Sequence, residues 1–415
     1  MMNSQLDLAT VEQERTEKIS ALLWITFAIC FLSNIFAGLF STLMSVYLPV
    51  VVRTLSGNTS NEELNTISAY INSLYLVGWA IGGFCWGWIA DSIGRSRSLI
   101  LSVGSFGFFT FIISTSTSWE SVVAFRLLSG FAVGGILVLT PTLLSEVWPQ
   151  KTRSVILGID SIGFPIGIFS SGLVNYLVSD WRQAFILGAI PIALAIVSIW
   201  LLKESQNWHS AKSKVSKRLS TLTSENRSNL IKGSIIFSSM LIGLWGLFSW
   251  IPTWVQSLLH DSDGQTERGI TMMLLGAGGL TGGFISGWIS NAVGVRKAMM
   301  ICFAGCITMS FLLFAINDSF SKIIYLEIAL LSMFFGISQG LLSIYITQLF
   351  PFNIRGTATG FCFNIGRPVT AVAVFFVGTL VTTLGGYSNA LLSFAAIFIA
   401  GFITIFLTKE NSSIK

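Results

Sequence analysis

Charged residues are scarce in this chain. Only 10% of its 415 residues are Asp, Glu, Lys or Arg, while 53% are hydrophobic. A soluble domain has about a quarter of its residues charged, so the composition excludes a soluble globular protein. The apolar runs are continuous and do not alternate with polar residues, which excludes a membrane β-barrel. The chain is therefore predicted to be an all-α polytopic membrane protein.

Histidines and metal-binding patterns are also scarce. The two histidines, His209 and His260, fall outside the cores of the apolar runs, so a carboxylate would have to carry any transported proton. Cys302 and Cys306 share a helix face, but no histidine or carboxylate lies near them in sequence. We expect no metal site, no disulfide framework and no cofactor, since no cofactor motif occurs.

The N-terminal segment lacks the short apolar stretch and cleavage site of a signal peptide. Residues 1–19 are polar, and we expect them to form a cytoplasmic tail. A net charge of +5 would suggest nucleic acid for a soluble protein, but here it follows from basic loops. We therefore expect no nucleic-acid partner. The expected partners are the lipid bilayer, a small-molecule substrate and protons, and we expect the chain to act as a monomer.

Twelve apolar runs are long enough to cross a bilayer, which takes about 20 residues. They cover 20–51, 66–90, 97–117, 120–146, 153–178, 181–202, 230–259, 267–290, 297–316, 322–349, 355–384 and 387–408. The hydrophilic stretch 203–229 predicts a cytoplasmic linker between an N-terminal half, 20–202, and a C-terminal half, 230–408. Residues 409–415 form a second tail.

The lysines and arginines predict the orientation. With the N-terminus inside, 18 of them lie on the inner side and four, Arg53, Arg182, Arg268 and Lys322, lie on the outer side. Cytoplasmic loops are enriched in Lys and Arg. We therefore expect both termini in the cytoplasm, with the chain in the plasma membrane or bacterial inner membrane.

A glycine-rich stretch occurs twice. Residues 82–97 read GGFCWGWIADSIGRSR and residues 282–297 read GGFISGWISNAVGVRK, an offset of 200. Each joins two apolar runs through a basic turn. Residues 146–153 match 348–355, and Leu48-Pro49 matches Ile251-Pro252, at similar offsets. These pairs predict two duplicated, pseudo-symmetric six-helix halves.

The first copy resembles a family motif. Gly87, Asp91, Gly94, Arg95 and Arg97 match the G-x-L-x-D-R-x-G-R-R/K turn of the major facilitator superfamily, although Ser92 replaces the usual Arg. The resemblance implies the major facilitator fold of twelve transmembrane helices, and transport by alternating access around a site near the midplane. It also implies that this turn belongs to a cytoplasmic gate. The alternative is that Arg95 and Arg97 only follow the positive-inside rule.

A second charge pattern lies at the end of the fourth run. Glu146 and Arg153 flank Pro149 and resemble the family's E-x-x-P-x-x-x-R motif. In the second half Gln348 replaces the Glu, while Arg355 remains. The resemblance implies a charge network that forms in one state of the gate and breaks in the other. The alternative is a static ion pair that fixes a turn.

Three charged residues inside apolar runs need partners or a water-filled cavity. Arg126 begins an R-x-x-x-G-x-x-x-G pattern that is similar to the family's span-four motif, and the repeat places Glu327 near the position symmetric with it. We predict an Arg126–Glu327 pair, with snorkelling of Arg126 to the outer interface as the alternative. Asp160 and Glu327 are the candidate proton carriers. For Asp160, the alternative is a structural hydrogen bond to a neighbouring helix.

Residues 360–367, GFCFNIGR, narrow the resemblance. Together with Leu349-Phe350-Pro351 and Arg355 they look like the metabolite and sialate–proton symporter branch, and Trp181-Arg182 fits the wider sugar-porter-like pattern. The candidates for substrate binding are Arg367, Asn364, Gln339, Tyr75 and Trp250, with Trp245 and Trp254 as further aromatic candidates.

Arg367 is the candidate substrate anchor. It lies near the midplane, where an arginine can hold a carboxylate through two parallel hydrogen bonds. The alternative is that Arg367 pairs with a fixed acid, such as Asp160, and sets helix packing.

The leading functional hypothesis is a secondary active transporter that imports a small polar organic solute with protons. The solute would be an organic acid, a sugar acid or a sugar. A proton-coupled exporter of drugs or metabolites and a non-transporting receptor on the same scaffold are alternatives. An intramembrane enzyme is disfavoured, because no cluster of His, Ser, Cys or paired acids lies at a common depth.

Overall fold

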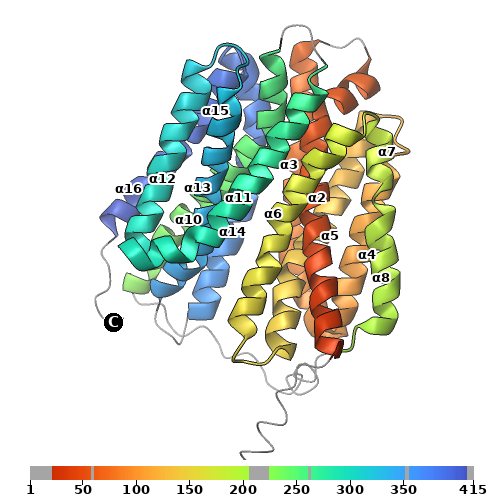
Figure 1. Cartoon of the computed structure of the whole chain (residues 1–415), viewed down its shortest axis with the longest axis vertical. Coiled ribbons are helices and arrows are strands. Elements are labelled where there is room, and N and C mark those ends of the chain that lie inside the picture. The colour runs from red at the N-terminus through yellow and green to blue at the C-terminus, as the bar shows by residue number, and fades with distance from the viewer. Residues whose placement is uncertain (1–20, 58–59, 205–223, 260–262, 351–354, 409–415) are drawn as a thin grey trace, which may run out of the picture.

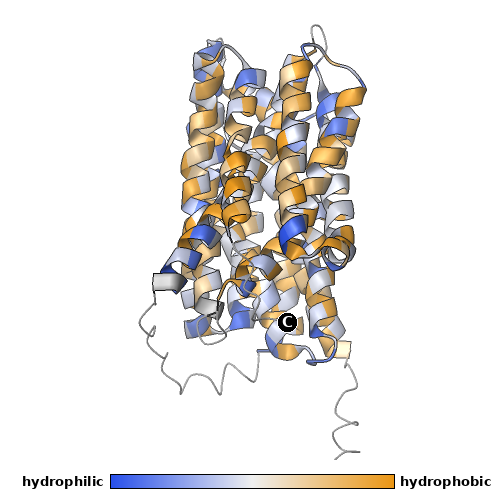
Figure 2. Ribbon diagram, turned by 90° about the vertical axis from the view of Figure 1, so that its left-hand side faces the viewer, coloured by the Kyte–Doolittle hydropathy of each residue, from blue (hydrophilic) through white to orange (hydrophobic). Residues whose placement is uncertain are grey.

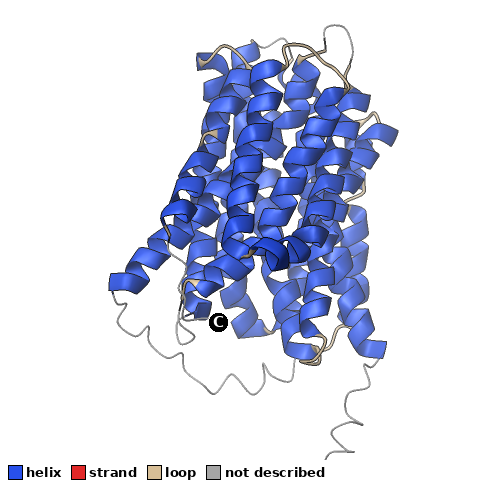
Figure 3. Cartoon of the chain, turned by 60° about the vertical axis from the view of Figure 1, so that its left-hand side comes forward, coloured by secondary structure: helices blue, strands red, loops and turns tan. Residues whose placement is uncertain are grey.

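The computed structural model describes residues 21–57, 60–204, 224–259, 263–350 and 355–408. Within these ranges every regular element is a helix (Figure 3). The N-terminal group contains α2 (Ala21–Ser56), α3 (Asn61–Ile93), α4 (Arg95–Ile113), α5 (Trp119–Val147), α6 (Arg153–Leu177), α7 (Trp181–Ile186) and α8 (Ala189–Leu201). The C-terminal group contains α10 (Ser224–Ser257), α11 (Gln265–Val293), α12 (Val295–Phe311), a π-helix (Leu312–Ile316), α13 (Ile323–Gln348), α14 (Arg355–Thr383), α15 (Tyr387–Ala395) and α16 (Ile397–Leu407).

Twelve helical spans in the described part are long and apolar enough to cross a membrane, which confirms the predicted number. α7 and α8 together form one span, as do α15 and α16. Several boundaries differ from the sequence-based ones, and two of them change where a helix begins by five residues or more. α3 begins at Asn61, where Ser60 accepts a hydrogen bond from the Glu63 amide and so caps the helix. α10 begins at Ser224, so the end of the predicted linker is helical.

The two groups of helices form two halves that stand side by side (Figure 1). α3 of the first half packs against α14 of the second, and α11 packs against α6. The second span of each half therefore meets the fifth span of the other, as expected for a duplicated fold. α2 begins and α16 ends at the same end of the bundle (Figure 1). We name this the inner end, following the predicted orientation.

The glycine-rich repeat allows close packing of helices. A Cβ atom at Gly82 in α3 would overlap the carbonyl group of Phe131 in α5. The second half repeats this contact, because a Cβ atom at Gly282 in α11 would overlap the carbonyl group of Met333 in α13. Membrane helices associate closely where small residues let their backbones touch. The duplicated glycines therefore fix equivalent helix pairs in the two halves.

The outer surface of the bundle is apolar. Hydrophobic residues cover the helices along most of their length, with hydrophilic ones towards the ends (Figure 2). Large exposed side chains include Trp88, Trp200, Phe284 and Trp288. Exposed apolar area of this extent is typical of a surface that contacts lipid.

The turn between α3 and α4 needs glycine. Gly94 has φ 108° and ψ 156°, a conformation almost restricted to glycine. The carboxylate of Glu204, just after α8, accepts hydrogen bonds from the amides of Arg95 (2.8 Å) and Ser96 (3.2 Å). A carboxylate is favourable at a helix N-terminus, where amides are unpaired and the helix dipole is positive. A side chain at Gly94 would displace Glu204.

We predict that Gly94→Ala destabilises the protein, because alanine in this conformation costs about 1–3 kcal/mol. Gly87→Ala is the matched control. Gly87 belongs to the same motif but is helical, and its added Cβ atom meets nothing within 4 Å. Thermal unfolding of the purified variants measures the difference. Equal melting temperatures for the two variants would contradict the role assigned to Gly94.

Candidate functional site

Aromatic rings from both halves meet near the middle of the membrane. The ring of Trp79, near the middle of α3, lies 4.8 Å from that of Trp245 in α10, measured between centroids. Phe164 in α6 lies 6.1 Å from Trp79 and 6.3 Å from Trp245. Trp79 and Trp245 are both buried. These three side chains form an aromatic cluster that joins the two halves at mid-depth.

Arg367 lies one helical turn from this cluster, on the inner side. Its Nη1 atom would be 2.5 Å from a Cβ atom added at Gly83, four residues after Trp79 in α3. The guanidinium group of Arg367, which belongs to α14, therefore reaches the first half. The absence of a side chain at Gly83 leaves room for it. Arg367 is partly exposed. The structure thus places a cation where the two halves meet.

Arg126 is held within its own half. Its side chain is 2% exposed and donates to the carbonyl oxygens of Phe40 (3.1 Å) and Ser41 (3.3 Å) in α2. The guanidinium carbon also lies 3.6 Å from the centre of the Tyr75 ring, a cation–π contact. The Tyr75 hydroxyl shares a hydrogen bond with the Ser41 hydroxyl.

The predicted Arg126–Glu327 pair is wrong for this structure. Glu327 instead accepts a hydrogen bond from Asn317 within its own half (2.9 Å). Two backbone carbonyls and an aromatic face contact the buried guanidinium group in place of a carboxylate, and its Nε atom has no hydrogen-bond partner among the described residues. The alternative of snorkelling to the outer interface also fails, because Arg126 is buried.

Asp160 is the one Asp or Glu that is buried among the described residues. Its Oδ2 atom accepts a hydrogen bond from the Asn34 amide (2.8 Å), and the same amide group lies 3.1 Å from the Thr140 hydroxyl. Its Oδ1 atom is buried without a hydrogen-bond partner in the described part of the chain. α2, α5 and α6 thus enclose a carboxylate that has no cation beside it. The alternative pairing of Asp160 with Arg367 is not found.

Charged residues at the inner end form a network around Arg95. Its guanidinium group lies 2.7 Å from Asp91 and 3.1 Å from Glu146, which connects the α3–α4 turn to the end of α5. Arg97 is exposed. The expected Glu146–Arg153 pair is not formed, because Arg153 donates to the backbone carbonyl of Trp148. This carbonyl belongs to the residue after the end of α5, so Arg153 closes the turn.

The remaining predicted binding residues do not gather in one place. Tyr75 is covered by Arg126, and Gln339 in α13 is exposed. Trp250 is fully buried near the outer end and packs against Tyr387. The side chains of Asn364 and Arg355 lie outside the described part of the structure. Sequence reasoning missed Trp79, Phe164, Asn34 and Thr140, since no local pattern distinguishes them from lipid-facing or core residues.

Further contacts join the halves near the outer end. The Tyr387 hydroxyl donates to the Asn65 side-chain oxygen (2.6 Å), and the Gln265 amide donates to the Asn175 carbonyl (2.7 Å). At the crossing of α6 and α11, a Cβ atom at Gly172 would overlap the carbonyl group of Gly269. These contacts hold the outer ends of the two halves together.

Two six-helix halves that meet around a cation and an aromatic cluster at mid-depth have the architecture of a membrane transporter. The family model of the Major Facilitator Superfamily matches residues 22–369, and the chain belongs to this superfamily. It is therefore a multi-pass secondary transporter and not an enzyme, as predicted.

Named relatives agree with this assignment. The Cis,cis-muconate transport protein of Acinetobacter baylyi is 27% identical over 375 residues, which cover 86% of this chain and 89% of the relative. The Sialic acid transporter NanX of Escherichia coli is 27% identical over 368 residues and covers 86% of each chain. The inward open structure of the xylose transporter XylE from E. coli matches with a TM-score of 0.76 at 14% identity. That match covers 95% of this chain and 98% of the other, and it confirms the fold.

We predict that Ala69→Cys with Gly378→Cys forms a disulfide between the halves. A Cβ atom at Gly378 would lie 2.8 Å from that of Ala69, and about 3.8 Å is usual, so a small shift suffices. Thiol alkylation before and after mild oxidation measures bond formation. Ala69→Cys with Gly385→Cys is the control, because a Cβ atom at Gly385 meets nothing within 4 Å. The proposed closeness of α3 and α14 is refuted if both pairs oxidise equally slowly.

Proposed function

We propose that this transporter imports small organic acids together with protons. The position of Arg367 carries the proposal, since its guanidinium group reaches from one half to the other at mid-depth. A guanidinium group can hold a carboxylate through two parallel hydrogen bonds. The names of two relatives support this substrate class, because cis,cis-muconate and sialic acid both carry carboxylate groups.

The aromatic cluster completes the proposed substrate site. Trp79 and Trp245 come from different halves and lie one turn from Gly83, the residue that Arg367 contacts. Their flat faces suit a planar or ring-shaped carbon skeleton, while Arg367 takes the carboxylate. A substrate held in this way would touch both halves, so its binding would favour the state in which they close around it.

Asp160 is proposed to carry the proton. A charged carboxylate inside a membrane protein is expensive, and such groups often form proton relays. The Asn34 amide holds one carboxyl oxygen, while the other has no partner among the described residues and is available for a proton. Binding a proton there would remove the net charge from the enclosed site.

The Arg95 network is proposed as the inner gate. Asp91, Arg95 and Glu146 connect the α3–α4 turn with α5 at the end from which substrate would leave. We propose a role in opening and closing this end for the other residues of the same motif, Gly87, Gly94 and Arg97, and for Arg153 and Arg355. The inner end is proposed to face the cytoplasm.

We predict that Arg367→Lys weakens carboxylate transport strongly, because a lysine cannot reproduce two parallel hydrogen bonds. In proteoliposomes, the KM for labelled cis,cis-muconate should rise at least about tenfold, which corresponds to about 1.4 kcal/mol of binding free energy. Arg227→Lys is the matched control, since Arg227 is exposed near the inner end and belongs to none of the proposed sites. Imposing the proton gradient in each direction distinguishes import from export. An unchanged KM would eliminate Arg367 as the anchor.

We predict that Asp160→Asn abolishes accumulation of substrate against its gradient but leaves substrate exchange intact. The asparagine keeps the shape of the side chain and can still accept the Asn34 hydrogen bond, but it binds no proton. Uptake driven by a pH gradient and counterflow without one measure the two activities. Glu327→Gln, which neutralises the other candidate, is the comparison. Full accumulation by Asp160→Asn would exclude the proposed role.

A further inference from the structure

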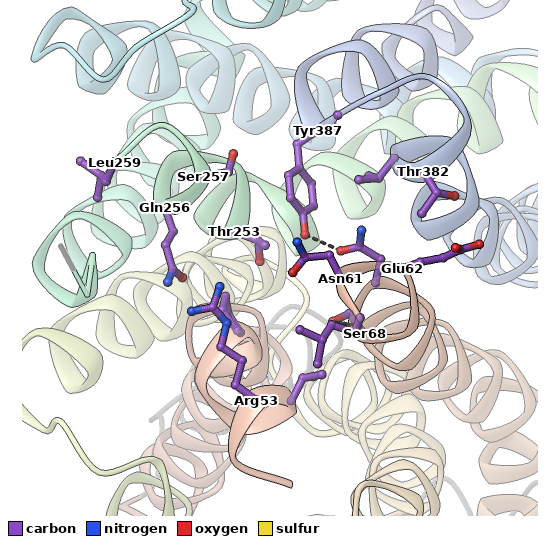
Figure 4. A pocket seen from close by; sticks show the side chains of 16 residues that line it. Arg53, Asn61, Glu62, Ser68, Thr253, Gln256, Ser257, Leu259, Thr382 and Tyr387 are labelled. Atoms are coloured by element: carbon purple, nitrogen blue, oxygen red, sulfur yellow. Dashed lines mark hydrogen bonds between the residues drawn. The ribbon is translucent and has the colours of Figure 1, made fainter. Parts of the chain in front are cut away.

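A cavity of about 740 Å³ lies at the outer end, between the two halves (Figure 4). Arg53 lines it from α2, Glu62 and Asn65 from α3, Gln256 from α10 and Tyr387 from α15. The hydrogen bond between Tyr387 and Asn65 links the halves at this cavity. The cavity is separate from the mid-depth cluster, and none of its lining residues belongs to that cluster.

Two amide groups that line the cavity, those of Gln256 and Asn65, are oriented to donate hydrogen bonds. The side-chain oxygen of Gln256 accepts a hydrogen bond from Arg268 (2.8 Å), whose side chain is only 1% exposed. The side-chain oxygen of Asn65 accepts one from Tyr387. Because both amide oxygens are engaged, each amide NH2 group remains as a donor. The buried Arg268 therefore acts as a positioning residue that fixes the orientation of Gln256.

Two further groups that line the cavity, Arg53 and Thr253, can donate hydrogen bonds to a ligand. The exposed guanidinium group of Arg53 has no ion-pair partner within the described ranges, and it points into the cavity (Figure 4). The Thr253 hydroxyl lines the cavity and is buried without a hydrogen-bond partner among the described residues. Glu62 is the one acidic residue among the described residues that line the cavity, and it is exposed. A cation, two amide donors and a hydroxyl favour an anion over a neutral solute.

We propose that this outer cavity is a peripheral binding site for the carboxylate of an incoming organic acid. The identification of this anion as the substrate rests on the proposed function. The existence of an anion site in the cavity is independent of it. The contacts that close the outer end lie beside the cavity, so an anion can occupy it while the halves are closed on that side. The site would raise the local concentration of substrate before the halves open.

Binding of labelled benzoate to the purified full chain tests the proposal. We expect the wild type to bind benzoate at two sites when benzoate is titrated up to millimolar concentrations. Arg53→Gln should lower the benzoate affinity of one site about fivefold, which is the effect expected from the loss of one exposed charge contact. Glu62→Gln should increase the affinity of the same site for benzoate, because it removes an acidic group that lines the cavity. Opposite effects of these two changes are specific to an anion site.

Lys322→Gln is the matched control. Lys322 is an exposed outer-end cation that does not line the cavity, so this change removes the same charge without altering the site. Equal affinities of Arg53→Gln and Lys322→Gln, or a single site in the wild type that Arg53→Gln leaves unchanged, would overturn the proposal. Arg367→Lys should affect the other site. If Arg367→Lys leaves benzoate affinity unchanged while Arg53→Gln lowers it, the proposed role of Arg367 as substrate anchor is refuted and the proposed outer-cavity site is supported.

Discussion

Polar groups buried in a bilayer must find their partners within the protein, since no water is available there. Two buried charges of the N-terminal half, Arg126 and Asp160, find hydrogen-bond partners inside that half. Arg126 donates hydrogen bonds to two backbone carbonyls of α2. Asp160, in α6, accepts a hydrogen bond from Asn34, which also belongs to α2. α2 therefore supports both charges of the first half. Aromatic rings, glycines and neutral hydrogen bonds join the two halves at several described contacts, and such contacts break at lower cost than buried ion pairs.

Much of the fold could be predicted from the sequence, because spans and duplication leave local patterns. Apolar runs gave the twelve spans, and the repeated glycines marked equivalent helix pairs. The partner of Arg126 could not be found in the same way. Every residue carries a backbone carbonyl, so the acceptors at Phe40 and Ser41 have no signature in the sequence. The symmetry of the repeat favoured Glu327, and that inference was wrong.

The site was predicted only in part, for a related reason. Arg367 could be proposed as a site residue from the sequence because a charge within an apolar run is conspicuous. Its neighbours are not: Trp79 and Trp245 meet from helices far apart in the chain, and either ring could equally have faced lipid. Asn34 and Thr140 approach Asp160 from two other helices, which only the packing of α2, α5 and α6 determines. The contacts of the two repeated turns could not be predicted either. Glu204 accepts a hydrogen bond from the turn between α3 and α4, whereas Arg296, after the turn between α11 and α12, donates to a backbone carbonyl at the end of α16.

The crossing of α6 and α11 has a consequence for the speed of transport. Gly172 and Gly269 bring two backbones into contact with no side chains between them. Glycine has no side-chain rotamers, so Gly172 and Gly269 themselves need no rearrangement when the two backbones separate. The activation barrier for separation here then reflects the loss of short-range dispersion contacts and their replacement by solvent. A smooth crossing of this kind lets two rigid halves separate quickly and return to the same position.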